Sequence, residues 1–323
     1  MKLGLIIPKS VGQSASLIAL AVATVIGATL TIETLLWIAP GDPIDLLPNG
    51  AHLRPILEAE WGLNRPLTER WWDALVRLTH GDLGVSMSVR PGVGVWTLIA
   101  APVGRSLYWV VLAMLTSISM GFIATSKKTA AKRIFHALGI FSIAPLFLLT
   151  HLAINSINGL TYSAISNSYI DRPNFFALPI EESLVRTTLA IFLLAYASGN
   201  LNGWREEIAV IRHRIDTSDY VMATRSRGLP VWQHYLFNAI PPFVSVVVAR
   251  LPLYLGGLVI LERLFLLEGA GALLWNAALL RDYPLAAGLT LIFAGFVIFT
   301  RLVASLIQVQ IDPRHHLGRA SNA

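Results

Sequence analysis

Long apolar stretches alternate with shorter polar segments along the whole chain. A helix that crosses a bilayer needs roughly 20 mostly apolar residues, and glycine and proline are tolerated inside such a helix. The pattern therefore predicts an all-α, polytopic membrane protein. Six transmembrane helices are expected, at about residues 15–39, 102–125, 134–155, 184–201, 239–261 and 286–309.

Composition supports the membrane assignment. Hydrophobic residues make up 54% of the 323 residues and charged residues only 14%, with a mean hydropathy of +0.61. A soluble domain carries about 25% charged residues. Lys2 and Lys9 precede an apolar stretch that is too long for the core of a signal peptide, and no convincing cleavage site follows it. The first stretch is therefore expected to remain as a spanning helix.

Lysine and arginine are distributed unequally between the loops. With the N-terminus placed inside, the inside segments carry thirteen of these residues, whereas the two shorter outside loops carry three. Cytoplasmic loops are enriched in lysine and arginine, so both termini are predicted to be cytoplasmic. The chain then divides into a cytoplasmic N-terminus with the first span, an extracytoplasmic loop region, a transmembrane domain with a coupling loop at 202–238, and a cytoplasmic tail. Their bounds are 1–39, 40–101, 102–314 and 315–323.

The segment 215–230 has the signals of a short capped helix between two spans. Three good N-cap residues begin it: Asp216, Thr217 and Ser218. Asp219 suits the first turn, and Arg225 and Arg227 suit the last, because of the helix dipole. Gly228 suits a left-handed C′ position, and Pro230 prevents continuation of the helix. An ordinary interfacial helix would show the same signals.

Residues 220–229 also resemble the EAA-type loop of ABC importer permeases, in the form found in the oligopeptide/dipeptide/nickel group. In that family the loop forms a coupling helix that docks on an ATPase subunit. Small residues at Ala223 and Gly228 match its pattern, which His234, Asn238, Ala239 and Pro241 continue. The resemblance implies that the coupling residues are Asp219, Tyr220, Ala223, Arg225, Arg227, Gly228 and Leu229.

Short motifs along the rest of the chain resemble the same family in their order and spacing. They are Pro40-Gly41-Asp42-Pro43, Gly62-Leu63-Asn64-Arg65-Pro66-Leu67, Gly81-Asp82-Leu83-Gly84-Val85-Ser86, the group Glu262, Phe265, Gly269 and Gly271, Arg281-Asp282-Tyr283-Pro284, and Ile311-Asp312-Pro313-Arg314. Three places depart from the family pattern: the order Ala223-Thr224, Ser106-Leu107 in place of Thr-Leu-Glu, and Gly269 where a proline is usual.

The resemblance implies the fold of a type I ABC importer permease in the bacterial inner membrane. Its expected partners are a second homologous permease subunit, two ABC ATPase subunits, an extracytoplasmic substrate-binding protein and membrane lipid, with no nucleic acid. The chain itself is expected to be no enzyme and to bind no cofactor, since ATP and Mg²⁺ belong to the ATPases. The implied function is import of peptides, or of a related solute such as a nickel chelate, by alternating access.

Three residues of the fifth expected span are candidates for the translocation path. Arg250 lies about midway along it, and an intramembrane cation is a functional-site hypothesis by default. The alternative is a buried ion pair with an acid, for which Glu33 is no obvious mate. Gly256 and Gly257 permit close helix approach or a kink. Simple packing explains these two glycines better than a gating role.

Several other chemistries find no support in the sequence. The absence of cysteine excludes disulfides, thiolate metal sites and a cysteine nucleophile. There is no P-loop, no HExxH and no G-x-S-x-G nucleophile elbow, and His315 and His316 are expected to be solvated instead of binding metal. An ATP-independent channel or secondary carrier would explain six spans but not the coupling loop. An intramembrane hydrolase would need a partner for His151, and none is evident.

Overall fold

The computed structural model describes residues 9–39, 41, 43–46, 50–125, 133, 139, 142–165 and 180–311. Within this part of the chain the secondary structure is almost entirely helical, and its only β contact is a bridge between Val85 and Gly94. The expected all-α class is confirmed to that extent. The chain forms two compact units, one of Met1–Ile99, Ile240–Ala249 and Asn276–Ala323, the other of Ala100–Ala239 and Arg250–Trp275.

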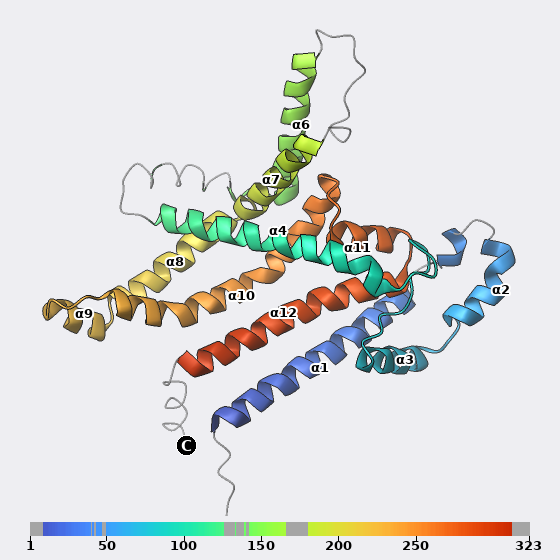
Figure 1. Cartoon of the computed structure of the whole chain (residues 1–323), viewed down its shortest axis with the longest axis horizontal. Helices are drawn as coiled ribbons and strands as arrows, with labels where there is room; N and C mark the ends of the chain where they lie inside the picture. Colours follow the sequence, from blue (N-terminus) through green and yellow to red (C-terminus); the bar gives the residue numbers. More distant parts are fainter. Residues whose placement is uncertain are drawn as a thin grey trace, which may run out of the picture. The chain divides into compact units, whose positions relative to one another are not determined.

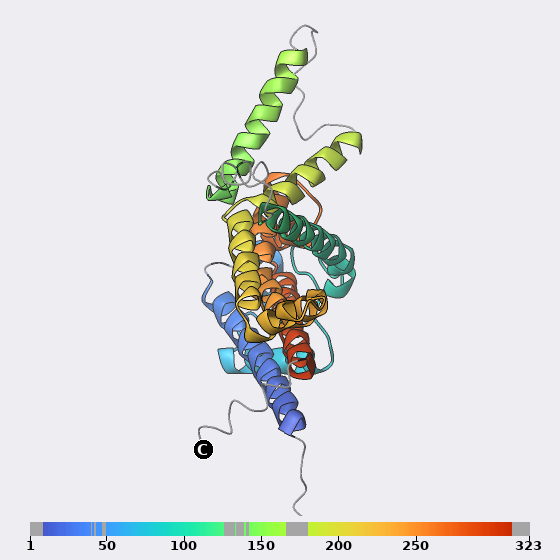
Figure 2. The ribbon, with the colours of Figure 1, turned by 90° about the vertical axis from the view of Figure 1, so that its left-hand side faces the viewer.

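Two long helices lie side by side in the first unit. α1 (Lys9–Ile38) packs against α12 (Tyr283–Ile311), as Figures 1 and 2 show. α1 leaves large apolar side chains such as Leu20 and Leu35 exposed. Such a surface fits a helix whose solvent on that side is lipid, because hydrocarbon imposes no penalty on apolar side chains.

The region after α1 holds a short helical subdomain. It contains the 3-10 helix η1 (Pro43–Leu46), α2 (Gly50–Trp61) and α3 (Leu67–Thr79), and α3 packs on α1. The indole N–H of Trp71 on α3 donates to the Thr34 hydroxyl on α1 at 3.1 Å. The sequence predicts only a loop region here. The helices are amphipathic and shorter than a span, so they do not form long apolar runs in the sequence.

Most of the second unit is built from helices that precede or follow the coupling segment. They are α4 (Val95–Ala124), α6 (Leu146–Ile165), α7 (Ile180–Tyr196), α8 (Asn200–Asp216), α9 (Asp219–Ser226), α10 (Trp232–Leu264) and α11 (Ala270–Leu279). α7 packs on both α6 and α8. α4 begins seven residues before the expected span at 102–125, because the 84–95 turn already brings Val95 into helical conformation.

The helix at the expected span 184–201 is interrupted near its C-terminal end. α7 stops at Tyr196, and α8 continues after a bend of 49°. Ser198 and Gly199 have φ angles of +52° and +77°, which break the helix. The bend is held by hydrogen bonds from Ser198 and Gly199 N–H to carbonyls of residues 144 and 142, which sequence spacing does not reveal.

The number of spans stays partly a prediction. Four described helices are long and apolar enough to cross a membrane, and a fifth span results if the bent α7–α8 pair is counted as one. The four segments are Ile18–Ile38, Val95–Ala124, Phe237–Leu264 and Tyr283–Gln308. The expected span at 134–155 lies partly outside the described residues, which omit 134–138, 140 and 141, and its described apolar part, Leu146–Ser156, is shorter than a full span.

Candidate functional site

The short helix that the sequence predicts between two spans is present as α9, between α8 and α10 (Figure 1). Of the three candidate N-caps, Ser218 occupies the position, with an extended backbone at φ −77° and ψ 140°. Its hydroxyl does not cap the helix, however, but donates to the Ile215 carbonyl at 2.6 Å. The N-cap side chain thus ties the start of α9 to the end of α8.

The C-terminal end of α9 has a Schellman motif. Gly228 has a φ of +67°, as the sequence predicts for the C′ position. The N–H of Gly228 donates to the Arg225 carbonyl at 3.0 Å, and the N–H of Leu229 donates to the Thr224 carbonyl at 3.2 Å. A methyl group added at residue 228 would have no atom within 4 Å, so a side chain there is opposed by backbone conformation and not by crowding.

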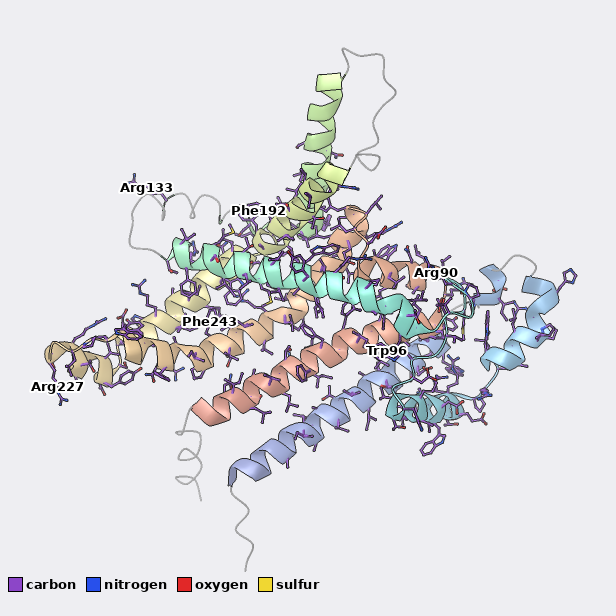
Figure 3. The ribbon with its side chains drawn as sticks, in the orientation of Figure 1. Arg90, Trp96, Arg133, Phe192, Arg227 and Phe243 are labelled. Carbon is purple, nitrogen blue, oxygen red and sulfur yellow. The ribbon has the colours of Figure 1, made fainter. Side chains whose placement is uncertain are left out.

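α9 has an inner face and an outer face. Val221 and Thr224 are buried, whereas Met222, Leu229 and Trp232 each expose about half or more of their surface. The candidate coupling residues Asp219, Ala223, Arg225 and Arg227 are also exposed. Figure 3 shows Arg227 at the tip of the segment, where α9 ends. The segment therefore presents apolar and cationic side chains together, as a surface that binds a partner protein does.

Asp216 forms a side-chain link that sequence reasoning missed, since it was considered only as an N-cap. Its carboxylate accepts hydrogen bonds from the Tyr235 hydroxyl and from Arg225 Nη2, the latter at 2.5 Å. Arg212 Nε lies 4.0 Å from the other oxygen. The end of α8, the last turn of α9 and the first turn of α10 are therefore joined at one carboxylate.

These contacts change the protonation equilibria of the link. The hydrogen bond from Tyr235, and then that from Arg225, lower the pKa of Asp216 below its usual 3.8. The hydrogen bond to Asp216 raises the pKa of Arg225 above its usual value. Burial, with the bond to Asp216 second, raises the pKa of Tyr235. The link is therefore an ionised carboxylate with two protonated donors across the physiological range.

Arg250, the candidate path residue, packs against α8. Its guanidinium carbon lies 5.4 Å from the centre of the Trp204 ring, and Nη2 lies 3.8 Å from Glu207 Oε1. Its side chain is only 16% exposed. A methyl group at Gly203 would overlap the guanidinium, so this glycine makes room for it. The acid that pairs with Arg250 is Glu207 of the same chain, and Glu33 instead lies near Arg70 and Arg77.

A chain of polar contacts continues from Trp204. Its indole N–H donates to the Tyr254 hydroxyl at 2.9 Å, and this hydroxyl lies 2.5 Å from that of Ser117. The Ser117 hydroxyl also contacts the Ala195 carbonyl at 2.7 Å, next to the bend between α7 and α8. Buried polar groups are costly unless they are hydrogen-bonded, so this chain fixes α4, α8 and α10 to the bend.

The two candidate path glycines, Gly256 and Gly257, differ in how closely other residues approach them. A methyl group at Gly257 would lie 2.8 Å from Leu194 Cδ1 and 3.1 Å from Leu146 Cδ2, so Gly257 permits close helix approach. Gly256 is exposed, with no atom within 4 Å of such a methyl group. The geometry of Gly257 supports the packing interpretation for that residue.

Glu262 organises the turn where α11 begins. It is fully buried and lies 2.5 Å from the Ser106 hydroxyl, and it accepts the Ala272 N–H at 2.9 Å. The Ser106 oxygen in turn accepts the Ala270 N–H at 2.7 Å. A methyl group at Gly269 would overlap the Glu262 carboxylate. The two departures from the family pattern, at Ser106 and Gly269, thus meet at one buried carboxylate.

Asp282 has the same role in the other unit. It is buried, and its carboxylate accepts the N–H groups of Met87, Ser88 and Val89 at 2.9 to 3.1 Å. The Ser86 hydroxyl and the Leu285 N–H, the latter at 3.3 Å, are two further donors. The motif at 81–86 and the motif at 281–284, far apart in sequence, therefore form one structural unit.

The alternative chemistries gain no site from the geometry. His151 lies 2.9 Å from the Asn155 amide nitrogen, so it does have a partner, but an amide is not a nucleophile. In the described part of the chain no group of three or more His, Asp and Glu residues is placed to hold a metal ion. His315 and His316 lie outside the described residues.

Apolar helices long enough to span a bilayer, with a short capped helix between two of them, define a multi-pass membrane protein. Residues 214–316, which include α9, match the family described as "Binding-protein-dependent transport system inner membrane component". The family match and the relatives together support a permease subunit of an ABC importer, in the group of the dipeptide, oligopeptide and nickel permeases.

Similarity to individual relatives extends over nearly the whole chain. A Brucella ovis protein assigned as a peptide permease is 29% identical, over 88% of this chain and 93% of the relative. The oligopeptide transport system permease protein AppB of Bacillus subtilis is 26% identical, over 91% and 96%. The nickel import system permease protein NikB of Staphylococcus aureus is also 26% identical, over 90% and 87%.

Proposed function

We propose that this permease moves peptides across the inner membrane by alternating access, driven by partner ATPases that dock on α9. The observation that carries the proposal is the geometry of α9. α9 exposes Met222, the residues just after it expose Leu229 and Trp232, and α9 is joined to both neighbouring helices at Asp216. The Asp216 link joins α9 to α8 and α10, so movement of a docked ATPase can pass through these contacts to the neighbouring helices.

The proposed assembly contains this chain, a second homologous permease subunit, two ABC ATPase subunits and an extracytoplasmic binding protein. ATP and Mg²⁺ bind to the ATPases, and this chain binds no cofactor. Nucleotide must stabilise the two conformations of the permease differently, since a ligand shifts an equilibrium only by its differential affinity. The peptide assignment rests on the similarity to peptide permeases; a nickel chelate is the related alternative, because a nickel permease is equally similar.

The proposed topology has six spans and two cytoplasmic termini, with the fourth span at 184–201 and with residues 202–238, which include most of α8 and all of α9, in the cytoplasm. The acidic and basic residues of α8 support this placement, because charged side chains are expensive in hydrocarbon. They include Arg205, Glu206, Arg212 and Arg214. Cysteines introduced singly at the exposed Thr79 and Ser226 test it, since the chain has no others. An impermeant thiol reagent should label residue 79 and not residue 226 in intact cells.

The substitution Gly228→Asp tests the coupling role. A residue with a Cβ in the left-handed region costs about 1–2 kcal/mol, and the added carboxylate faces the negative end of the helix dipole. We expect normal insertion in the membrane, because the spans drive insertion. ATPase subunits should be lost on co-purification, or should hydrolyse ATP without uptake.

Gly81→Asp is the matched control. Gly81 also has a positive φ, of +66°, and also has no atom within 4 Å of an added methyl group. It lies outside the coupling segment, so its backbone strain is similar but its ATPase contacts are not. The coupling role is rejected if Gly228→Asp leaves both co-purification and uptake normal, or if Gly81→Asp uncouples the complex equally.

A further inference from the structure

The first unit contains a pocket of about 460 Å³ that lies outside the coupling segment. Its lining comes from α1, from the end of α2, from α3, from the 82–87 loop and from the first turns of α12. Binding sites for small molecules occupy roughly 300–1,000 Å³ and combine apolar walls with a few convergent polar groups. The volume therefore suits a small solute or a lipid headgroup.

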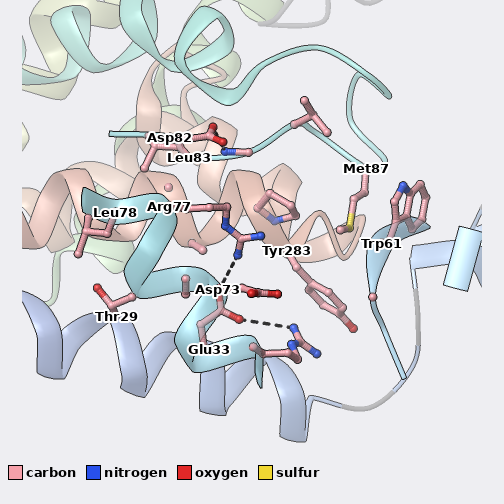
Figure 4. A pocket seen from close by; sticks show the side chains of 18 of the residues that line it. Thr29, Glu33, Trp61, Asp73, Arg77, Leu78, Asp82, Leu83, Met87 and Tyr283 are labelled. Atoms are coloured by element: carbon pink, nitrogen blue, oxygen red, sulfur yellow. Dashed lines mark hydrogen bonds and ion pairs between the residues drawn. The ribbon is translucent and has the colours of Figure 1, made fainter. Parts of the chain in front are cut away.

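The charges of the pocket are balanced and arranged around Glu33. The lining has three arginines and three acids: Arg65, Arg70, Arg77, Glu33, Asp73 and Asp82. Figure 4 shows the Glu33 carboxylate pointing from α1 into the pocket, toward Arg77. A cavity that carries equal charge of both signs favours a ligand that is itself a zwitterion over a simple anion or cation.

The Glu33 carboxylate can accept a further hydrogen bond. It lies within the apolar segment Ile18–Ile38, and its side chain is only 12% exposed. The nearest arginine nitrogens, on Arg70 and Arg77, are 3.6 and 3.9 Å away, longer than an N–H···O hydrogen bond. A carboxylate offers about four acceptor sites, so these two contacts leave acceptor capacity directed at the pocket.

The other groups have places suited to the two ends of such a ligand. Arg77 is half exposed and lies at the rim, where it can bind an anionic oxygen. Asp73 Oδ2 lies 2.7 Å from Arg65 Nη1, so these two side chains form an ion pair with each other and are not assigned to the ligand. Trp61 and Tyr283 also line the pocket (Figure 4), and aromatic faces attract ammonium groups.

We propose that this pocket binds a small zwitterion, with its primary ammonium on the Glu33 carboxylate and its carboxylate or phosphate on the Arg77 guanidinium. Two sources supply this chemistry: a free peptide, and the headgroup of an aminophospholipid such as phosphatidylethanolamine. The peptide source rests on the proposed function, whereas the lipid source does not.

The test uses the full chain with its co-purified partner subunits, without a binding protein, in lipid nanodiscs. In discs of phosphatidylglycerol alone, equilibrium dialysis measures binding of radiolabelled glycyl-alanine. In discs that also contain phosphatidylethanolamine, native mass spectrometry counts the aminophospholipid molecules retained after detergent washing. N-acetyl-glycyl-alanine and glycyl-alaninamide, each lacking one charge, should bind at least tenfold more weakly than the free dipeptide.

Two variants locate the site. Glu33→Gln removes the carboxylate charge with little change in shape, and Ala287→Leu fills the pocket while keeping every charge. Each should reduce binding of the retained ligand at least tenfold. Glu58→Gln is the matched control, because Glu58 is a carboxylate of the same unit outside this pocket. If the Glu33→Gln protein fails to accumulate, ligand binding by the Ala287→Leu protein alone tests the proposal.

Each result has a defined meaning. Dipeptide binding that both variants abolish identifies a peptide as the ligand, and retained aminophospholipid with the same variant pattern identifies a lipid headgroup. Binding of neither, or binding that neither variant reduces, overturns the proposal. Peptide uptake by the complete transporter is measured separately, so uptake without such binding leaves the proposed function standing while the pocket proposal fails.

Discussion

The carboxylates of Asp282 and Asp216 each join separate segments of the chain, but they differ in burial and in the donors that they bind. Asp282 is fully buried, and its donors are four backbone N–H groups and the Ser86 hydroxyl. Asp216 is 35% exposed, and its donors are the side chains of Arg225 and Tyr235. The first joins two segments of the region near α12; the second joins three helices around the candidate coupling segment.

The difference in burial and in donor type separates a link that is fixed, at Asp282, from a link that can be released, at Asp216. Backbone donors in a buried site cannot rotate away, and each would be left unpaired at a cost if the carboxylate were lost. Side-chain donors at a partly exposed carboxylate are able to turn to water, so their release costs little. A transporter needs both kinds of link, since some parts must stay rigid while the segment that receives the ATPase movement must be able to change its contacts.

Removing the buried carboxylate should have the largest effect. Asp282→Ala removes the carboxylate that accepts from the N–H groups of residues 87–89 and 285 and from the Ser86 hydroxyl. Because each unsatisfied buried donor costs about 1–3 kcal/mol, we expect a total loss of about 3 kcal/mol or more. Thermal unfolding in detergent and the amount of protein in membranes measure it. Glu69→Ala, at an exposed position of the same unit, should change neither; an unchanged melting temperature for Asp282→Ala would remove the basis of the comparison.

An intermediate effect is expected where Arg250 meets α8. Gly203→Ala places a methyl group where the guanidinium lies, without changing any charge. Overpacking of this kind costs about 1–3 kcal/mol, so the variant should be less stable than wild type. Arg250→Gln should lower stability similarly if Arg250 serves mainly to pack α8 against α10.

The uptake of assembled complexes distinguishes the two roles of Arg250. Uptake per assembled complex should stay near that of wild type in both variants if the residue is structural. A loss of uptake in Arg250→Gln, with normal assembly and ATP hydrolysis, would instead support a role for Arg250 in the translocation path. Arg250 would then not be mainly a structural residue.

Removing the exposed carboxylate should cost little stability but should alter coupling. Asp216→Ala releases Arg225 and Tyr235, and exposed ion pairs contribute at most about 1 kcal/mol. We expect the variant to insert and assemble normally, while the amount of ATP hydrolysed per solute imported rises. Thr217→Ala is the neighbouring control. If Asp216→Ala were as destabilising as Asp282→Ala, the distinction between fixed and releasable links would not hold.

The smallest expected effect is a dependence on pH. Since hydrogen bonds from Tyr235 and Arg225 lower the pKa of Asp216 below 3.8, its link is fully present above about pH 5 and is lost only as the pH falls through the folded-state pKa. The difference in melting temperature between wild type and Asp216→Asn should therefore be constant from about pH 5 to 8 and should shrink below about pH 4. A difference that varies near neutral pH would point to another titrating group.

Local sequence signals predicted the parts of the protein that depend on neighbouring residues. Apolar runs predicted four of the spans to within several residues, because their burial in lipid is a property of each helix alone. The three candidate N-caps at 216–218 and Gly228 predicted the approximate ends of α9 for a similar reason: caps and left-handed turns are set within a few residues.

Only the tertiary structure decided the features that join distant residues. Asp282 and Ser86 are 196 residues apart, and Glu262 and Ser106 are 156 apart, so no local pattern shows that each pair meets. The bend at Ser198 and Gly199 depends on hydrogen bonds to residues 142 and 144 of a preceding segment. Asp216 looked like a helix cap because its sequence neighbours favour one, but the fold brings Tyr235 and Arg225 within reach, and a charged carboxylate binds the strongest donors available to it.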